Sequence, residues 1–332
     1  MREICTYGST RGLQVKVACD PVHSSRVRRN VLGLGGFFHL RSTLLVKERF
    51  FMDKRKRNLP RGWYPVDAKD CKREIESFIE GWSPPSVLPS VGMGGIVPHA
   101  GWTFSGKLTA KVFYTLRSRR EVEVVILYGG HMGPGDLPHV VTEEAWETPF
   151  GDIKIDRDFV ETLMKRIDMK KENPSSGDNT IEVQLAMVRH FFPEAKLVAV
   201  RSPHSTKAIE LGEKVAEIAK EKGISILAIG STDLTHYGPN YGLLVKGVGP
   251  SSVEWVKKEN DSGLIKAALK MDAGSVLTHA EEHESACSAG AAASALTTCK
   301  AMGAGKGVLL DYFTSYDIMP DASFVGYAGI VY

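Results

Sequence analysis

The chain of 332 residues is 43% hydrophobic and 24% charged, with a formal net charge of +3, which is typical of a globular protein and not of a disordered or fibrous one. No apolar run approaches the roughly 20 residues of a membrane-spanning helix, so we expect no membrane association. The five cysteines are odd in number, widely spaced and free of CxxC pairs, which argues against a disulfide framework or zinc ribbon and favours a reducing, cytoplasmic location.

Positive charge is concentrated at the N-terminus. Residues 1–57 hold 13 Lys or Arg against 4 Asp or Glu, a net charge of +9, and show little periodicity. We expect a basic, poorly ordered extension over 1–57 and a folded domain over 58–332. A transit peptide or a true start at Met52 would also explain this composition. The run at 54–57 lacks interleaved aromatic residues, which favours a solvated tail and argues against nucleic acid as a partner.

Helical and strand-like patterns alternate from residue 67 onward. Helices are predicted over 67–82, 107–116, 157–167, 180–192, 207–222, 263–271 and 285–299. Buried strands are predicted in GGIVPH, VEVVILYGGH, ISILAIGSTDLTH and at 196–201, and a final antiparallel pair at 308–316 and 323–332. This order predicts an α/β fold of three layers, with a mostly parallel central sheet and helices on both faces.

Three of the predicted strands end in the same way. His99, His131 and the pair Asp233 and His236 each follow an apolar run and a few small residues. One strand-end histidine is usually a hydrogen-bonded structural residue. Three at equivalent positions indicate one converging site, because ligands of open parallel sheets bind where the strands end.

Cys287 is predicted in the first turn of the helix over 285–299, where the helix dipole favours a thiolate. A buried, inert cysteine is the alternative. Two neutral histidines and a thiolate would leave coordination positions open for a substrate or oxygen, as a catalytic metal needs. The acids Glu281 to Glu284 suit a helix start, and Glu284 is a reserve ligand.

Asp233 stands three residues before His236. Its carboxylate could orient that imidazole, raise its basicity or approach the metal itself. Alternatively, Asp233 caps a turn and His236 is a surface residue. The polar, glycine-rich loop from His236 to about residue 252 is predicted to cover the site as a lid.

Several segments together resemble the Memo family, also called AmmeMemoRadiSam system protein B. They are VPHAGWTFSG, ILYGGHMGPG, WETPFGDIKID, DNTIEVQL, STDLTHYGP and the Cys-x-x-Gly at residues 287–290. The resemblance runs from about Leu59 to the end. It implies a LigB-like fold, that of the class III extradiol dioxygenases, which hold non-haem Fe(II) with two histidines and a carboxylate.

Carried over by position, the resemblance implies that His99, His131 and Cys287 are metal ligands, with the cysteine in the carboxylate's place. It implies that His236 is the catalytic base and that Asp233 lies close by. The chain departs from the family pattern at residues 178–180, where Asp-Asn-Thr replaces Glu-His-Ser, and at Gly130 and Ser288. We therefore expect the ligands to be retained and the substrate to be altered.

These patterns allow several functions. The first is a redox enzyme of dioxygenase type with Fe(II), where Cu(I) or Zn(II) could compete because thiolate is softer than carboxylate. The second is a non-catalytic protein that binds a metal or peptide in the same cleft, with radical-SAM or AMMECR-type partners as the family's name suggests. A hydrolase using Cys287 and His236, or a zinc hydrolase, is a further alternative.

Overall fold

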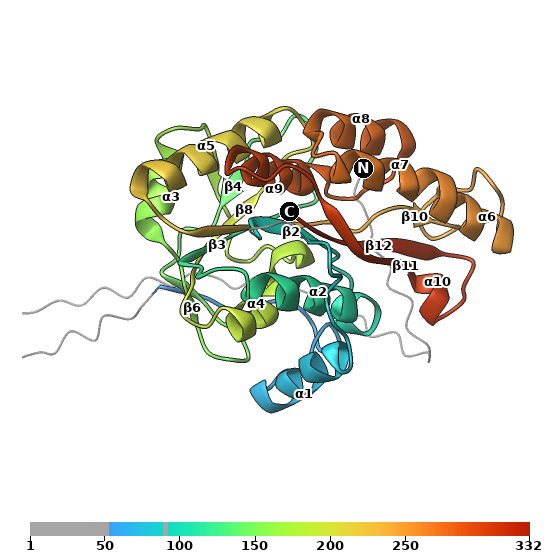
Figure 1. Ribbon diagram of the computed structural model, residues 1–332, viewed down its shortest axis with the longest axis horizontal. Helices are drawn as coiled ribbons and strands as arrows, with labels where there is room; N and C mark the ends of the chain where they lie inside the picture. Colours follow the sequence, from blue (N-terminus) through green and yellow to red (C-terminus); the bar gives the residue numbers. More distant parts are fainter. Residues whose placement is uncertain (1–52, 89–91) are drawn as a thin grey trace, which may run out of the picture. The chain divides into compact units, whose positions relative to one another are not determined.

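The computed structural model describes residues 53–88 and 92–332 (Figure 1). The expected disorder of the basic extension falls on residues 1–52, outside the described part, whereas residues 53–57 lie inside it. The described helices are α1 (Ala68–Ile79), α2 (Trp102–Arg117), α3 (Arg157–Met164), α4 (Asn179–Phe191), α5 (Lys207–Lys222), α6 (Pro250–Trp255), α7 (Asp261–Leu269), α8 (Ala273–His283), α9 (Ala289–Ala301) and α10 (Ser315–Ile318), with a π-helical turn η1 at Val256–Asn260.

The described residues form a nine-stranded sheet in the order β10-β12-β2-β9-β3-β8-β4-β7, with β11 paired to β12. Four parallel strands occupy its centre: β2 (Gly94–Val97), β9 (Ile226–Ser231), β3 (Val124–Gly129) and β8 (Lys196–Arg201). Most of their side chains are apolar and buried on both faces, as expected of strands covered by helices on either side.

The flanking strands make the sheet mixed. β12 (Phe324–Val331) is antiparallel to β2, β11 (Val308–Thr314) and β10 (His236–Tyr237), and β4 (His139–Val140) is antiparallel to β8. β7 (Lys170–Lys171) extends the far edge beside β4. The predicted α/β class with helices on both faces is confirmed, and the parallel arrangement is confined to the centre and to the β4–β7 pair.

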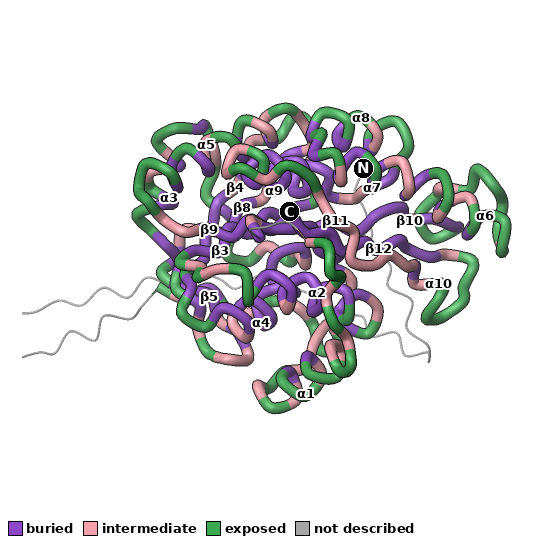
Figure 2. The backbone as a smooth tube through the Cα atoms, in the orientation of Figure 1, coloured by how far each residue is buried: buried purple, intermediate pink, exposed green. Residues whose placement is uncertain are grey.

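Two helical layers enclose the sheet (Figure 1). Helices α1, α2 and α4 lie on one face and α3, α5, α8 and α9 on the other. The strands between them form the buried centre (Figure 2). The alanine-rich α9 comes close to β9, because a Cβ added to Gly230 would lie 2.7 Å from the Ala291 carbonyl oxygen. No helix in the described residues is both long and apolar enough to cross a membrane.

The predicted helix over 285–299 begins later than expected. Residues Glu281 to His283 belong to the last turn of α8, and Glu284 ends that helix with a φ of 49°. Ser288 is the N-cap of α9, so Cys287 lies in the connecting loop and not in the first helical turn. The acids that resemble a helix start therefore stand at the end of another helix.

A small second sheet involves the residues interpreted as a solvated tail. β1 (Lys54–Arg55) pairs with β5 (Ala145–Trp146), which pairs with β6 (Ile153–Lys154). The side chain of Arg55 is only 3% exposed and lies 3.7 Å from a Glu143 oxygen and 3.8 Å from a Glu172 oxygen. Its guanidinium stands 4.3 Å above the Trp146 ring. The interpretation of residues 54–57 as a solvated tail is therefore wrong for Arg55.

Arg55→Ala should lower the free energy of unfolding by about 3 kcal/mol, because it leaves the buried Glu143 carboxylate without its charge partner. The exposed neighbour Lys56 serves as the control, since Lys56→Ala removes only a surface ion pair. Urea denaturation of both variants measures the difference. Equal loss of stability in the two would show that Arg55 contributes no more than a surface charge.

Asp261 at the start of α7 is a fully buried carboxyl group. Burial raises its pKa to about 7, although hydrogen bonds from Thr235 and Tyr312 favour the ionised form. An aspartate in the unfolded chain has a pKa of about 3.9. The fold thus favours the protonated form. This preference stabilises the folded state fully below about pH 4, and the stabilisation is lost as the pH rises through about 7.

Asp261→Asn should therefore make the melting temperature less dependent on pH. Between about pH 5 and pH 8 the melting temperature of the original protein should fall more than that of Asp261→Asn, because only the former must ionise a buried carboxyl group. Thermal unfolding of both proteins across this range tests the expectation. Two parallel pH profiles would contradict the raised pKa.

Candidate metal centre

The parallel strands β2, β3 and β9 all end at one edge of the sheet. His99 follows β2, His131 follows β3, and Asp233 follows β9. Pairing of β9 with both other strands fixes their register, so the strand ends lie side by side. The predicted convergence of the strand-end residues is therefore what this topology produces.

Three potential ligand atoms meet there. A nitrogen of His99, a nitrogen of His131 and Sγ of Cys287 all lie within 4.8 Å of one another. Cys287 Sγ is 3.1 Å from His99 Nε2. Ligand atoms on a common metal at about 2.0–2.3 Å stand roughly 3 to 4 Å apart, so the donor set fits a metal ion.

Of the three groups, Cys287 has the charge that suits a cation. Burial tends to raise the pKa of the Cys287 thiol, but the nearby His99 and His131 hold it well below its usual value. Burial tends to lower the pKa of His99, whereas Asp233 and Cys287 raise it to about 9. Burial likewise tends to lower the pKa of His131, whereas Asp178 and Cys287 raise it to about 10. A thiolate held between protonated imidazoles can exchange those protons for a metal ion.

Asp233 contacts His99 and not His236. Its Oδ1 accepts a hydrogen bond of 2.6 Å from the His99 backbone N–H, and Oδ2 lies 3.8 Å from Nε2. Burial raises the pKa of Asp233, while His99 opposes that shift. The expected orienting contact from Asp233 to the His236 ring is thus not formed. Asp233 instead holds the strand-end turn that presents His99.

His236 is oriented by the backbone. Its Nδ1 lies 3.0 Å from the Leu234 carbonyl oxygen, which requires Nδ1 to carry the proton. In the neutral ring Nε2 is then the free acceptor. The Tyr241 ring packs edge-on against the imidazole at 4.9 Å between centroids. His236 can therefore accept a proton at Nε2.

A series of charged side chains supports His131. Asp178 Oδ2 lies 3.3 Å from His131 Nδ1, and Arg201 Nη2 donates to the same oxygen at 3.1 Å. Arg201 also forms an ion pair with Glu172, which in turn pairs with Arg55. Because Asp178 holds Nδ1, it leaves Nε2 of His131 for a metal.

Asp178→Asn should weaken metal affinity by about 10- to 100-fold without removing a ligand, because it loosens the orientation of the His131 ring. Competition titration with a chromophoric chelator measures this change. Asp158→Asn, in the exposed first turn of α3, is the matched control. Unchanged affinity in Asp178→Asn would show that the contact does not orient the ligand.

The residues that depart from the Memo pattern lie around this site. The Asn179 side chain donates a 2.9 Å hydrogen bond to the His99 carbonyl oxygen, and the Thr180 hydroxyl accepts one of 2.7 Å from Gly130 N–H. Gly130 has a φ of 102°, and a Cβ there would approach the Arg201 Cβ to 2.7 Å. The glycine at position 130 therefore allows the close approach of Arg201. At the position where the family pattern has a histidine, the Asn179 side chain forms a hydrogen bond to the backbone.

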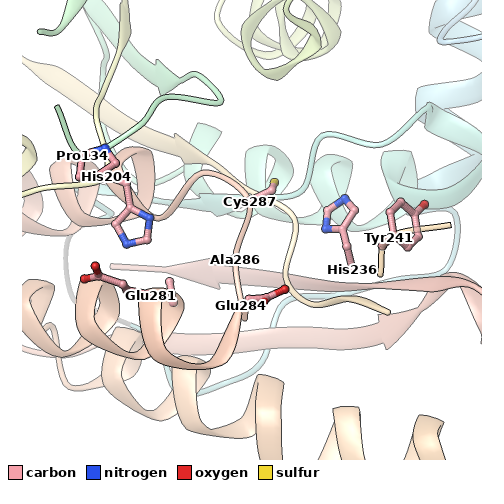
Figure 3. Close-up of a pocket in the computed structure, with 9 residues that line it drawn as sticks. Pro134, His204, His236, Tyr241, Glu281, Glu284, Ala286 and Cys287 are labelled. Carbon is pink, nitrogen blue, oxygen red and sulfur yellow. The ribbon is translucent and has the colours of Figure 1, made fainter. Parts of the chain in front are cut away.

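A cavity of about 330 Å³ opens beside Cys287 (Figure 3). Its lining includes three residues that the sequence interpretation missed: His204, Tyr241 and Glu281. His204 follows β8, so the strand-end pattern could have identified it. Tyr241 belongs to the predicted lid loop and reaches the cavity. The full lining is Pro134, His204, His236, Tyr241, Ala280, Glu281, Glu284, Ala286 and Cys287.

The sequence is similar to those of known proteins. The family model described as Memo-like protein matches residues 55–331. A MEMO1 family protein of Methanopyrus kandleri is 31% identical over 284 residues, covering 81% of this chain and 95% of its own. One from Methanocaldococcus jannaschii is 33% identical over 290 residues, with the same coverages. A solved, uncharacterized protein of Escherichia coli K12 has 18% identity and a TM-score of 0.39 over 67% of this chain and 90% of its own, too distant to indicate function.

Proposed function

Because this chain belongs to the Memo family, we propose that His99, His131 and Cys287 hold a metal ion that supports a redox reaction of dioxygenase type. The observation that carries the proposal is the meeting of three ligand atoms from separate segments within 4.8 Å. A cavity beside Cys287 provides room for a substrate. Three protein ligands leave positions open, as in non-haem iron oxygenases.

Fe(II) is the proposed metal, and when bound it would supply the redox chemistry toward O2 and a substrate. Cu(I) and Zn(II) are the alternatives, because the thiolate makes the donor set softer than two histidines and a carboxylate. The protein's own part is to orient the ligands and to exclude water around the buried His99. Asp233 and Asp178 hold the segments that present the two histidines.

His236 is the proposed base. It lines the same cavity as Cys287, and its Nε2 is the free acceptor because Nδ1 donates to the Leu234 carbonyl oxygen. A substrate hydroxyl that turns toward the metal could transfer its proton to Nε2. Catechols and other phenols carry such hydroxyl groups and form the substrate class to be tested.

A second candidate is a non-catalytic protein that binds a metal or a peptide in this cleft. The observation that favours it is the apolar character of the loop after β10, in which Leu244, Val245 and Val248 are exposed. Several exposed apolar side chains in one loop are typical of a binding surface, and Tyr241 of the same loop lines the cavity. Radical-SAM and AMMECR-type proteins are the proposed partners, and the thiolate ligand suits a reducing compartment such as the cytoplasm.

The deciding experiment is metal analysis of protein purified without oxygen, followed by oxygen-uptake measurements with a panel of catechols and phenols. Iron at about one equivalent with substrate-dependent oxygen uptake would support the proposal. Metal binding without turnover would favour the binding protein, and oxygen-independent hydrolysis would favour a zinc enzyme. Activity destroyed by iodoacetamide but resistant to chelators would indicate a cysteine hydrolase.

A further inference from the structure

A π-helical turn interrupts the helical segment behind His236. η1 (Val256–Asn260) lies between α6 and α7, and the side chains of the consecutive residues Asn260 and Asp261 both contact Thr235. Consecutive residues of a regular α-helix point about 100° apart and would not normally share one partner. Such π turns often occur at functional sites.

Asn260 connects two segments that line the cavity. Its Nδ2 donates a 2.9 Å hydrogen bond to the Thr235 hydroxyl and another of 2.9 Å to the His283 carbonyl oxygen. Thr235 directly precedes His236, and His283 directly precedes Glu284. Asn260 is only 3% exposed, so water cannot easily replace these bonds.

Asp261 also holds the segment of Thr235 and His236. It accepts hydrogen bonds from the Thr235 backbone N–H at 3.0 Å and from the Thr235 hydroxyl, and a third of 2.7 Å from Tyr312 in β11. Gly326 in β12 makes room for it, because a Cβ there would lie 1.9 Å from Asp261 Oδ2. The Thr235 hydroxyl thus accepts from Asn260 and donates to Asp261.

We propose that Asn260 and Asp261 are positioning residues that fix the separation between His236 and Cys287 across the cavity. His236, Cys287 and Glu284 line the same cavity (Figure 3). The Cys287 backbone N–H also donates to the Asp233 carbonyl oxygen at 3.3 Å, so the two segments touch at a second point. The inference rests on the proposed function in so far as His236 acts on a metal-bound ligand.

A purely structural role makes a different prediction. Removal of one member of a buried polar network costs stability, because the remaining members lose a hydrogen-bond partner. Asn260→Leu and Thr235→Val should then affect only the melting temperature. A positioning role requires in addition a loss in the interaction between a metal-bound ligand and His236, with metal affinity unchanged.

The test uses the full chain loaded with Co(II) and the chromophore 4-nitrocatechol as probe. Asn260→Leu and Thr235→Val should weaken 4-nitrocatechol binding by about tenfold and reduce the spectral change that marks its deprotonation, while Co(II) affinity is unchanged. Thr235→Ser retains the hydroxyl and should show a smaller defect than Thr235→Val. Asp272→Asn, which alters the N-cap of α8 without touching either segment, is the control.

Hydrogen–deuterium exchange of the metal-free variants supplies a second readout, in which residues 233–237 and 284–288 should lose protection together. Unchanged probe binding and unchanged exchange would overturn the inference, as would a parallel loss of Co(II) affinity. If the original protein binds no 4-nitrocatechol, the proposed substrate class fails, and exchange alone then decides the positioning role.

Discussion

His99→Ala should cost the protein its bound metal while the fold persists. His99 supplies one of three ligand atoms, and losing one of so few should weaken metal affinity by about 10³-fold or more. The fold should survive because the central strands pair through their backbones, independently of this side chain. Elemental analysis after dialysis and circular dichroism measure the two properties.

The other ligands allow matched comparisons. His131→Ala should resemble His99→Ala, and Cys287→Ser should lose metal whereas Cys299→Ser should not, because Cys299 is buried in α9 away from the three ligand atoms. His190→Ala is the histidine control. Stoichiometric metal with unchanged affinity in all three ligand variants would refute the site, and Glu284 would then be the next ligand to examine.

His236→Ala should spare the metal and abolish turnover. The ring is outside the group of three ligand atoms and instead offers Nε2 to the cavity. Loss of a general base typically lowers the rate by about 10²- to 10⁴-fold. Oxygen uptake with an active phenol measures the loss, and the spectrum of bound 4-nitrocatechol replaces it where no turnover is found.

His204→Ala provides the control for His236→Ala, since it removes an imidazole from the same cavity. The Nε2 atom of His204 lies 3.0 Å from the Leu277 carbonyl oxygen. The effect of His204→Ala on turnover should be much smaller. If metal loss in His236→Ala equals that in His99→Ala, then His236 is itself a ligand and its role as base must be abandoned.

Strand patterns were sufficient to predict the convergence of His99 and His131. Apolar segments that end in small residues specify both the strand and the edge where its next residue emerges, because parallel strands share their direction. Cys287 was associated with them through its expected place at a helix start and through the family resemblance, although it comes from a loop between two helices. Its predicted helical position was wrong because Glu281 to Glu284 resemble a helix start.

The supporting residues could not be predicted from the sequence. Arg55 lies in a basic run typical of a solvated tail, and only pairing of β1 with β5 buries it against Glu143 and Glu172. Likewise, the loop before α4 was expected to place Asp178 near the edge of the sheet, but Arg201 meets it at His131 only because β8 pairs with β3. Local periodicity carries no information on such contacts, because they depend on which strands become neighbours.

The most direct test of the metal centre is X-ray absorption spectroscopy of the metal in the full chain purified without oxygen. The expected spectrum is that of Fe(II) bound by two imidazole nitrogens and one sulfur, with the sulfur contribution lost in Cys287→Ser and retained in Cys299→Ser. A bound metal without sulfur among its ligands, or no metal retained or taken up on reconstitution, would contradict the account.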